Sequence, residues 1–222
     1  MTLSPPLFLE TRVYDLPTEA WYVIGVLHGD GSLIEFDHKT RKKSKNGIKT
    51  YIRKEKRLAL QTSSKKFAEH FASMLRELGF TVTINGPYKR TVFGKELTYY
   101  NVQTYTSAYN YFFDNMNRVP VSDADFYAFL SGFFDSDGCL VHDNKGAKTY
   151  TYLDFSNSDR VLLETIREQL VNRGFHPTRI YERKPSKTPV KQNSKVWRFK
   201  IGRQREVCEL IRRMRKWSWK FS

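Results

Sequence analysis

The sequence predicts an α+β protein built from two pseudo-symmetric αββαββα repeats. Two apolar stretches, residues 23–31 (VIGVLHGDG) and 130–138 (LSGFFDSDG), each close on Asp-Gly. After each stretch the same pattern follows: a hairpin of two strands, a helix ended by Gly-Phe, two more strands and a last helix. An internal repeat of this size indicates a duplicated domain with pseudo-twofold symmetry.

Both stretches carry small residues four positions apart, on one face of a predicted helix. These are Gly25 and Gly29 in the first stretch, and Gly132 and Ser136 in the second. Small residues at that spacing let two backbones approach closely. The two helices are therefore expected to pack on each other, which brings Asp30 and Asp137 side by side at their C-terminal ends. Carboxylates are disfavoured there and repel each other, so the pair indicates a divalent metal site on the seam between the halves.

The first half is expected to follow an irregular lead-in over residues 1–18, which contain three prolines, and to span residues 19–118. Its motif helix begins at Thr18 or Glu19. Asn46-Gly47 is the strongest hairpin signal, in the middle of a basic stretch from Lys39 to Arg57. The remaining elements are predicted as strands 32–36 and 57–61, a helix capped by Ser63 or Ser64 and ended by Gly79, strands near 80–90 and 96–105, and a helix through 109–116.

The second half follows a linker at residues 119–122 and spans residues 123–222. Its motif helix begins at Asp123 or Asp125. The elements after it are predicted as strands 139–142 and 149–155 around an Asn-Lys-Gly turn, a helix from Asp159 to Gly174, two strands flanking a basic loop at 184–195, and a final helix from about 203 to 217. The first hairpin is longer and more basic than its counterpart, which makes the halves unequal.

The two stretches resemble the LAGLIDADG motif of homing endonucleases. Two copies in one chain resemble the monomeric, archaeal or organellar intron-encoded members. The first copy departs at His28-Gly29, where the consensus reads Asp-Ala; the second has Phe133-Phe134 and Ser136 as conservative departures. The resemblance covers nearly the whole chain after residue 18. It implies a site-specific double-strand DNA endonuclease that hydrolyses phosphodiester bonds at a long asymmetric target with a divalent metal and serves intron homing.

The charge of the chain independently favours a nucleic-acid partner. The 222 residues carry a net charge of +15, with a pI near 9.8. Nucleic acid is the first candidate polyanion and an anionic membrane surface the second. No apolar run is long enough to span a membrane and no signal peptide is apparent, so a soluble, intracellular protein is expected, in the cytoplasm of a prokaryote rather than in an organelle. Cys139 and Cys208 have no metal-ligand or disulfide spacing and are interpreted as packing residues.

Antiparallel sheets with one helix-covered face and one free face would form a DNA-binding saddle. A two-stranded ribbon fits the major groove. A ten-residue strand spans about 33 Å, so two sheets side by side follow about 20 base pairs at about 3.4 Å per pair. A single lysine can equally be a solvated surface residue. The expected DNA contacts are Lys39, Arg41, Lys43, Lys45, Lys49, Arg53 and Arg57, then Lys89 and Arg90, then Arg179, Arg183, Lys187, Lys191 and Arg198.

Asp30 and Asp137 are the expected metal ligands and catalytic residues, with Mg²⁺ as the metal and Mn²⁺ able to substitute. A plain C-terminal turn is the alternative for a single Asp-Gly pair. The resemblance adds the backbone carbonyls of Gly29 and Ser136 as ligands. It also implies a polar residue at the end of the second strand in each half, matched here by Gln61 and Asn157, for which a helix-entry turn is the alternative.

A lysine near the attacking water is a further implication of the resemblance. Leu140 occupies one expected place, which leaves Lys200 as the candidate. His28 and Asp135 are expected to pack and hydrogen-bond rather than to bind metal, because they point elsewhere from the motif acids. The chain is expected to act as a monomer on double-stranded DNA, and no membrane partner is expected. An RNA-splicing maturase, a non-cleaving DNA-binding regulator and a generic RNA-binding protein remain alternatives.

Overall fold

The computed structural model describes residues 16–44, 47–92, 94–118, 120, 122–146, 148–183 and 195–221. The first half contains α1 (Thr18–His28), β1 (Gly31–Ser44), β2 (Gly47–Thr62), α2 (Lys65–Glu77), β3 (Thr83–Val92), β4 (Lys95–Thr104) and α3 (Thr106–Phe113). The second contains α4 (Asp123–Asp137), β5 (Gly138–Lys145), β6 (Lys148–Asn157), α5 (Arg160–Asn172), β7 (Tyr181–Glu182), β8 (Trp197–Ile201) and α6 (Gln204–Met214). The predicted α+β class and the αββαββα order of each half are confirmed.

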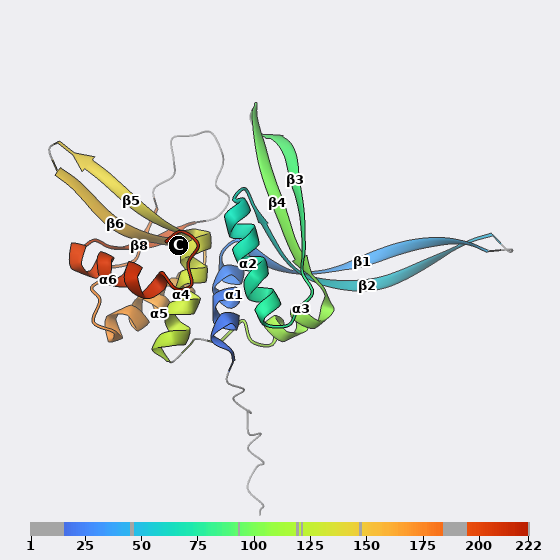
Figure 1. The fold of residues 1–222 in the computed structure, drawn as a ribbon, viewed down its shortest axis with the longest axis horizontal. Coiled ribbons are helices and arrows are strands. Elements are labelled where there is room, and N and C mark those ends of the chain that lie inside the picture. Colours follow the sequence, from blue (N-terminus) through green and yellow to red (C-terminus); the bar gives the residue numbers. More distant parts are fainter. Residues whose placement is uncertain are drawn as a thin grey trace, which may run out of the picture.

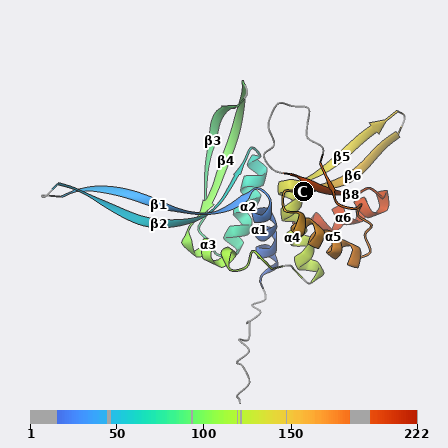
Figure 2. The same ribbon diagram turned by 180° about the vertical axis from the view of Figure 1, so that it is seen from behind.

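Each half builds its own antiparallel sheet, with strand orders β1-β2-β4-β3 and β5-β6-β8-β7. Figure 1 shows α1 and α4 between the two sheets, with the β3–β4 and β5–β6 hairpins projecting to the same side of the helices. The view from behind in Figure 2 shows the same arrangement. The equivalent strand orders establish the internal repeat at the level of topology.

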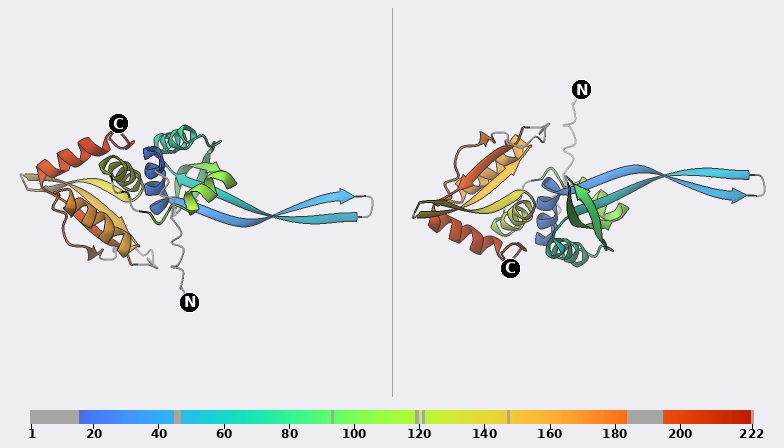
Figure 3. Two further views of the ribbon diagram at one scale, coloured as in Figure 1. Left: turned by 90° about the horizontal axis from the view of Figure 1, so that it is seen from below. Right: turned by 90° about the horizontal axis from the view of Figure 1, so that it is seen from above.

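The two motif helices pack as closely as their small residues predict. A Cβ added to Gly25 would lie 2.0 Å from the Phe129 carbonyl oxygen, and one added to Gly132 would lie 2.0 Å from the Tyr22 carbonyl oxygen. Neither position has room for a side chain, so the backbones of α1 and α4 touch directly. Figure 3 shows these helices side by side when the molecule is viewed from below and from above.

One face of each sheet packs against helices. Leu58, Leu60 and Val102 are fully or almost fully buried beneath the first sheet, where α2 and α3 lie. Phe155 and Phe199 stack beneath the second sheet, with ring centroids 5.0 Å apart, on the side of α5 and α6. Because side chains alternate along a strand, the residues between these positions lie on the free face of each sheet.

The first hairpin differs from its prediction. The pairing of β1 with β2 is continuous from Gly31↔Leu60 to Ser44↔Gly47 and takes in the basic stretch that was predicted to lie beyond the strands. A two-stranded ribbon satisfies its backbone hydrogen bonds without a buried face, so polar sequence can extend it. Glu35 lies 3.6 Å from Lys54 Nζ and 3.9 Å from Lys56 Nζ, which reduces repulsion among the cations. Figure 1 shows the result, a long arm extending away from the helices.

The hairpin of the second half is shorter, with 8 and 10 residues in β5 and β6 against 14 and 16 in β1 and β2. The edge strand β7 of this half is two residues long, and the predicted contacts Lys187 and Lys191 fall outside the described residues, as does Lys45 in the first half. The final helix ends at Met214 rather than near Trp217. Over the described residues, no helix combines the length and apolarity that a membrane span requires.

Candidate functional site

The C-terminal ends of α1 and α4 meet at the seam and bring the two motif acids together. A Cβ added to Gly29 would lie 2.3 Å from Ser136 Cβ and 3.4 Å from Asp137 Cγ, so the backbone before Asp30 contacts the opposite motif. The two carboxylates affect each other's ionisation. Burial, followed by the negative charge of Asp30, raises the pKa of Asp137 to about 6. Burial also raises the pKa of Asp30.

Asn157, at the end of β6, joins the two motif helices. Its Nδ2 donates to Asp137 Oδ2 over 2.6 Å and to the His28 carbonyl oxygen over 3.0 Å. The first bond favours the ionised form of Asp137 and opposes the rise in its pKa. The second satisfies one of the carbonyls left open at the end of α1. The predicted polar residue is thus in direct contact with a motif acid in the second half.

The first half is built differently. Gln61 is exposed, and its Nε2 donates to Asn101 Oδ1 over 3.0 Å rather than to Asp30. Sheet register explains the difference, because Gly31 pairs with Leu60 whereas Gly138 pairs with Phe155. Gln61 therefore corresponds to Ser156, which follows Phe155, and not to Asn157. The two half-sites of the seam are chemically unequal.

The donor atoms at the seam suit a hard divalent cation. Within the described residues, no hydrogen bond or ion pair engages the Asp30 carboxylate, and only Asn157 engages that of Asp137. The Ser136 carbonyl lies in the last turn of α4, where no helical N–H is available to it. Carboxylate and carbonyl oxygens are the ligands that Mg²⁺ and Ca²⁺ prefer. No group of three or more His, Cys, Asp or Glu side chains offers another such site in the part of the chain that the structure describes.

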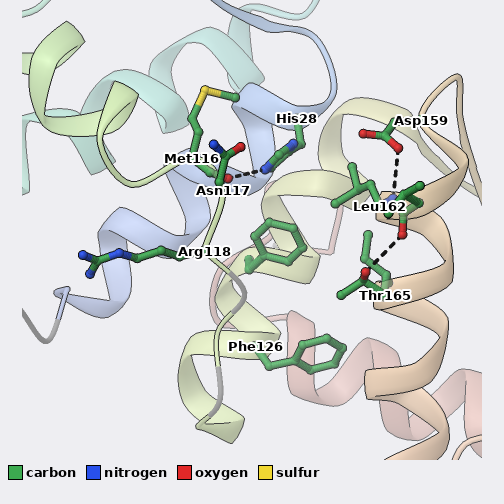
Figure 4. A pocket seen from close by; sticks show the side chains of 11 residues that line it. His28, Met116, Asn117, Arg118, Phe126, Asp159, Leu162 and Thr165 are labelled. Atoms are coloured by element: carbon green, nitrogen blue, oxygen red, sulfur yellow. Dashed lines mark hydrogen bonds between the residues drawn. The ribbon is translucent and has the colours of Figure 1, made fainter. Parts of the chain in front are cut away.

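His28 and Asp135 have other partners. Figure 4 shows the His28 ring beside a cavity of about 190 Å³, with Nε2 2.8 Å from the Met116 carbonyl oxygen. Burial lowers the pKa of His28, which favours the neutral ring. Asp135 is buried and accepts hydrogen bonds from the Tyr22 hydroxyl over 2.9 Å and from the Trp219 backbone N–H over 3.0 Å. Both side chains tie elements together around the carboxylate pair.

The lysine beside the carboxylates comes from an unexpected place. Lys200 lies on the free face of the second sheet, with Nζ 4.0 Å from the centroid of the Tyr152 ring, and no hydrogen bond or ion pair among the described residues joins it to either motif acid. Lys220, in the C-terminal segment, is close enough to both acids for its charge to oppose the rise in their pKa values. Nothing in a motif pattern points to Lys220. The alternating aromatic residues around it, Trp217, Trp219 and Phe221, are the only sequence sign that this segment is docked.

Because successive side chains along a strand point to opposite faces of the sheet, the predicted DNA contacts fall on two different faces. Lys49, Arg53 and Arg57 share the free face of β2 with Gln61, and Arg90 lies on the free face of β3. Lys39, Arg41 and Lys43 lie on the opposite face of the arm, the face that carries Leu33 near the helices. Lys89 also lies on that side, 2.9 Å from Glu96. In the second half Arg179 and Arg183 are exposed beside β7, and Arg198 Nε donates to Asp154 Oδ1 over 3.0 Å on the free face.

Comparison with known proteins supports the resemblance seen in the motifs. Residues 127–213 match the sequence model of the LAGLIDADG-like domain. The uncharacterized protein MJ0314 of Methanocaldococcus jannaschii is 27% identical over 149 residues, which cover 64% of this chain and 49% of MJ0314, so the chain spans about half the length of this curated relative.

Among solved structures, the homing endonuclease I-DmoI in complex with DNA and Ca superposes with a TM-score of 0.58 at 20% identity, covering 89% of this chain and 88% of that one. Full-length DUF199/WhiA from Thermatoga maritima superposes with a TM-score of 0.55 at 15% identity, over 91% of this chain and 57% of that one. The resemblance is thereby confirmed over residues 127–213, and the shared fold over about nine-tenths of the chain.

Proposed function

We propose that this chain, which has the LAGLIDADG fold in both halves and a LAGLIDADG-like domain at residues 127–213, is a divalent-metal-dependent, site-specific double-strand DNA endonuclease. One observation carries the proposal: two carboxylates, Asp30 and Asp137, one from each half, converge at the end of a seam that has no room for side chains. Such a pair is electrostatically unfavourable without a cation, and a protein that only bound nucleic acid would have no need of it.

The free faces of the two sheets supply the DNA-binding surface of the proposal. Arg53, Arg57 and Arg90 lie on one sheet and Arg198 and Lys200 on the other, on either side of the carboxylates. Most of these cations would contact phosphates, which position the duplex. Variants of I-DmoI, which shares this fold, have been crystallised with their target DNA in the presence of Mg and of Mn. We extend this partner and the use of a divalent metal to the present chain.

In this proposal Asp30 and Asp137 hold the metal with the carbonyls of Gly29 and Ser136. A bound divalent ion lowers the pKa of an attacking water and stabilises the leaving oxygen of a phosphodiester. Asn157 fixes the orientation of Asp137 and keeps its carboxylate ionised, and Gln61 with Asn101 presents polar groups to the DNA at the other half-site. One strand would be cut on each side of the pseudo-twofold axis by a monomer with two unequal halves.

The test is selection followed by cleavage. A randomised duplex library is bound to the protein in Ca²⁺, and the recovered sequences are then incubated in Mg²⁺ or Mn²⁺. The proposal expects double-strand cuts at one long asymmetric sequence, and their loss in Asp30→Asn and Asp137→Asn with DNA binding retained. Specific binding without cleavage in either metal would refute the nuclease and favour a non-cleaving DNA-binding regulator. Selective binding of structured RNA instead of duplex DNA would favour a maturase.

A further inference from the structure

The last described residues of the chain, Trp217 to Phe221, form a segment that crosses the seam. The segment follows α6 in the second half, yet it contacts α2 of the first half: the Trp217 carbonyl oxygen lies 2.5 Å from His70 Nε2, and the Trp219 ring stacks on Phe67 with centroids 5.6 Å apart. Figure 3 shows the end of the chain beside the two motif helices. We call residues 217–221 the C-terminal strap.

Asp135 anchors the strap next to the motif acids. Ser218 Oγ donates to Asp135 Oδ1 over 2.5 Å, while the Trp219 backbone N–H and the Tyr22 hydroxyl both donate to Oδ2. Only 3% of the Asp135 surface is exposed. This buried carboxylate thus joins α1, α4 and the strap at a point two residues before Asp137.

Lys220 uses this anchorage to reach the end of α4. Its Nζ donates to the carbonyl oxygens of Phe134 and Gly138, both over 2.8 Å. These two carbonyls flank the turn that carries Ser136 and Asp137, so one ammonium group bridges the start and the end of that turn. An ammonium is also the favourable charge at a helix C-terminus, where carbonyl dipoles and, in this protein, two motif carboxylates accumulate.

The backbone at Gly138 depends on the same contacts. A Cβ added to Gly138 would lie 2.1 Å from Cδ2 of the Phe134 ring, which stacks in turn on Phe221 with centroids 5.2 Å apart. The strap therefore holds the α4–β5 junction from two sides, by the ammonium on the carbonyls and by the aromatic stack. Asp137 is the last residue of the helix at this junction.

We propose that Lys220 is a positioning residue of the metal centre, which holds the Ser136–Asp137 turn in the geometry that binds the divalent ion. This inference rests on the proposed function and deepens it. The ammonium group beside the ligand turn comes from the C-terminal strap, across the seam, and not from Lys200 on the second sheet. Removing the ammonium loosens the ligand turn and leaves the DNA-binding faces unchanged.

The experiment compares Lys220→Met, which keeps length and removes charge, with Lys220→Arg, which keeps charge. Lys216→Met is the matched control, because it removes one cation four residues earlier, where Nζ lies over the Trp217 ring at 4.4 Å. The measurements are Ca²⁺ binding to the protein–DNA complex by calorimetry, DNA affinity in EDTA, and single-turnover cleavage against Mg²⁺ concentration. Positioning groups around metal ligands typically change metal affinity by about 10-fold to 100-fold.

We expect Lys220→Met to weaken Ca²⁺ binding and to raise the half-saturating Mg²⁺ concentration by about tenfold or more. At high Mg²⁺ concentration, the cleavage rate of Lys220→Met should return to that of the parent. Lys220→Arg should recover part of the lost metal affinity. DNA affinity in EDTA and all values for Lys216→Met stay at those of the parent. Equal metal dependence in Lys220→Met and the parent would overturn the inference while leaving the nuclease proposal intact, and a parent protein that never cuts would instead refute the proposed function.

A loss of stability alone is separated by Leu170→Ala, which leaves a cavity at a fully buried position of α5, outside the C-terminal strap, and keeps the Lys220 ammonium. Thermal unfolding of both variants is measured first. If Leu170→Ala loses at least as much stability as Lys220→Met but retains the parent Mg²⁺ dependence, the effect belongs to Lys220. If both variants raise the Mg²⁺ requirement equally, Lys220 has no positioning role of its own and the inference fails.

Discussion

The side-chain amide of Asn157 lies 2.6 Å from Asp137 Oδ2, and no equivalent contact reaches Asp30 within the described residues. The same amide donates to the carbonyl oxygen of His28, so it joins the ends of the two motif helices. The two half-sites of the seam therefore differ at this strand-end residue, which contacts Asp137 and not Asp30.

Removing this amide should affect one half-site more than the other. The hydrogen bond from Asn157 stabilises the Asp137 carboxylate, so Asn157→Ala should raise the pKa of Asp137 above its value of about 6. Hydrogen bonds to charged groups are worth roughly 1.5–3 kcal/mol, or about 1–2 pKa units. The cleavage rate at pH 6.5 should therefore fall by roughly 4-fold to 40-fold and be largely regained at pH 8.5.

Single-turnover cleavage of a duplex labelled on both strands, followed against pH, measures this effect. Gln61→Ala is the matched variant, since Gln61 bonds to Asn101 and not to a motif acid. An unchanged pH profile in Asn157→Ala would show that the amide does not control Asp137.

The metal-free protein should lose stability as the pH rises through 6. Folding raises the pKa of Asp137 from 3.8 to about 6, so the folded state binds the proton more tightly than the unfolded state. This stabilisation is fully present below pH 3.8 and is lost as the pH rises through 6. For a partly exposed group we expect roughly 1–2 kcal/mol.

Thermal unfolding in EDTA between pH 4.5 and 8 tests the sign. Asp137→Asn cannot ionise, so it should be more stable than the parent at pH 7.5 in EDTA and should gain little from added Mg²⁺. A parent protein that becomes more stable in EDTA between pH 5 and 7.5, with no change of slope in Asp137→Asn, contradicts the interpretation.

Adding a single methyl group between α1 and α4 should lower the free energy of unfolding. Gly132→Ala places a Cβ 2.0 Å from the Tyr22 carbonyl oxygen, so the backbones of α1 and α4 must separate. Overpacking of this kind costs about 1–3 kcal/mol and more where backbone must move. Urea denaturation measures the loss, and Gly202→Ala is the control.

At Gly202 an added Cβ comes no closer than 3.9 Å to Tyr152, in ordinary contact. A change within about 0.5 kcal/mol is expected there. Gly132→Ala with parental stability would mean that the helices are not held together at this point.

The arm formed by β1 and β2 should bind DNA with the face that carries Arg53 and Arg57. Arg53 lies on the face that carries Arg57 and Gln61, whereas Lys54 lies on the other face, 3.6 Å from Glu35. Arg53→Ala should therefore weaken duplex binding in Ca²⁺ and reduce the slope of log K against log salt by about 1.

Lys54→Ala removes the same charge from the neighbouring position and should change the slope less. Equal effects of the two substitutions would indicate that net charge, and not the free face, accounts for binding.

Local patterns predicted the architecture because helix and strand periodicities are short-range. The four-residue spacing of Gly25 with Gly29 and of Gly132 with Ser136 was enough to place two helices in backbone contact and two acids at one end. The strand extents of the arm were not predictable in this way, because a polar ribbon carries no buried face to mark where pairing stops.

The sequence by itself determined the duplicated fold, the seam and the convergence of Asp30 with Asp137, because each follows from residues a few positions apart. Only the tertiary structure decided which polar groups surround them. Asn157 reaches back 129 residues to His28, and Lys220 reaches 82 residues to Gly138. Contacts of that range depend on one-residue differences in sheet register and on where the end of the chain docks, and no local pattern encodes either.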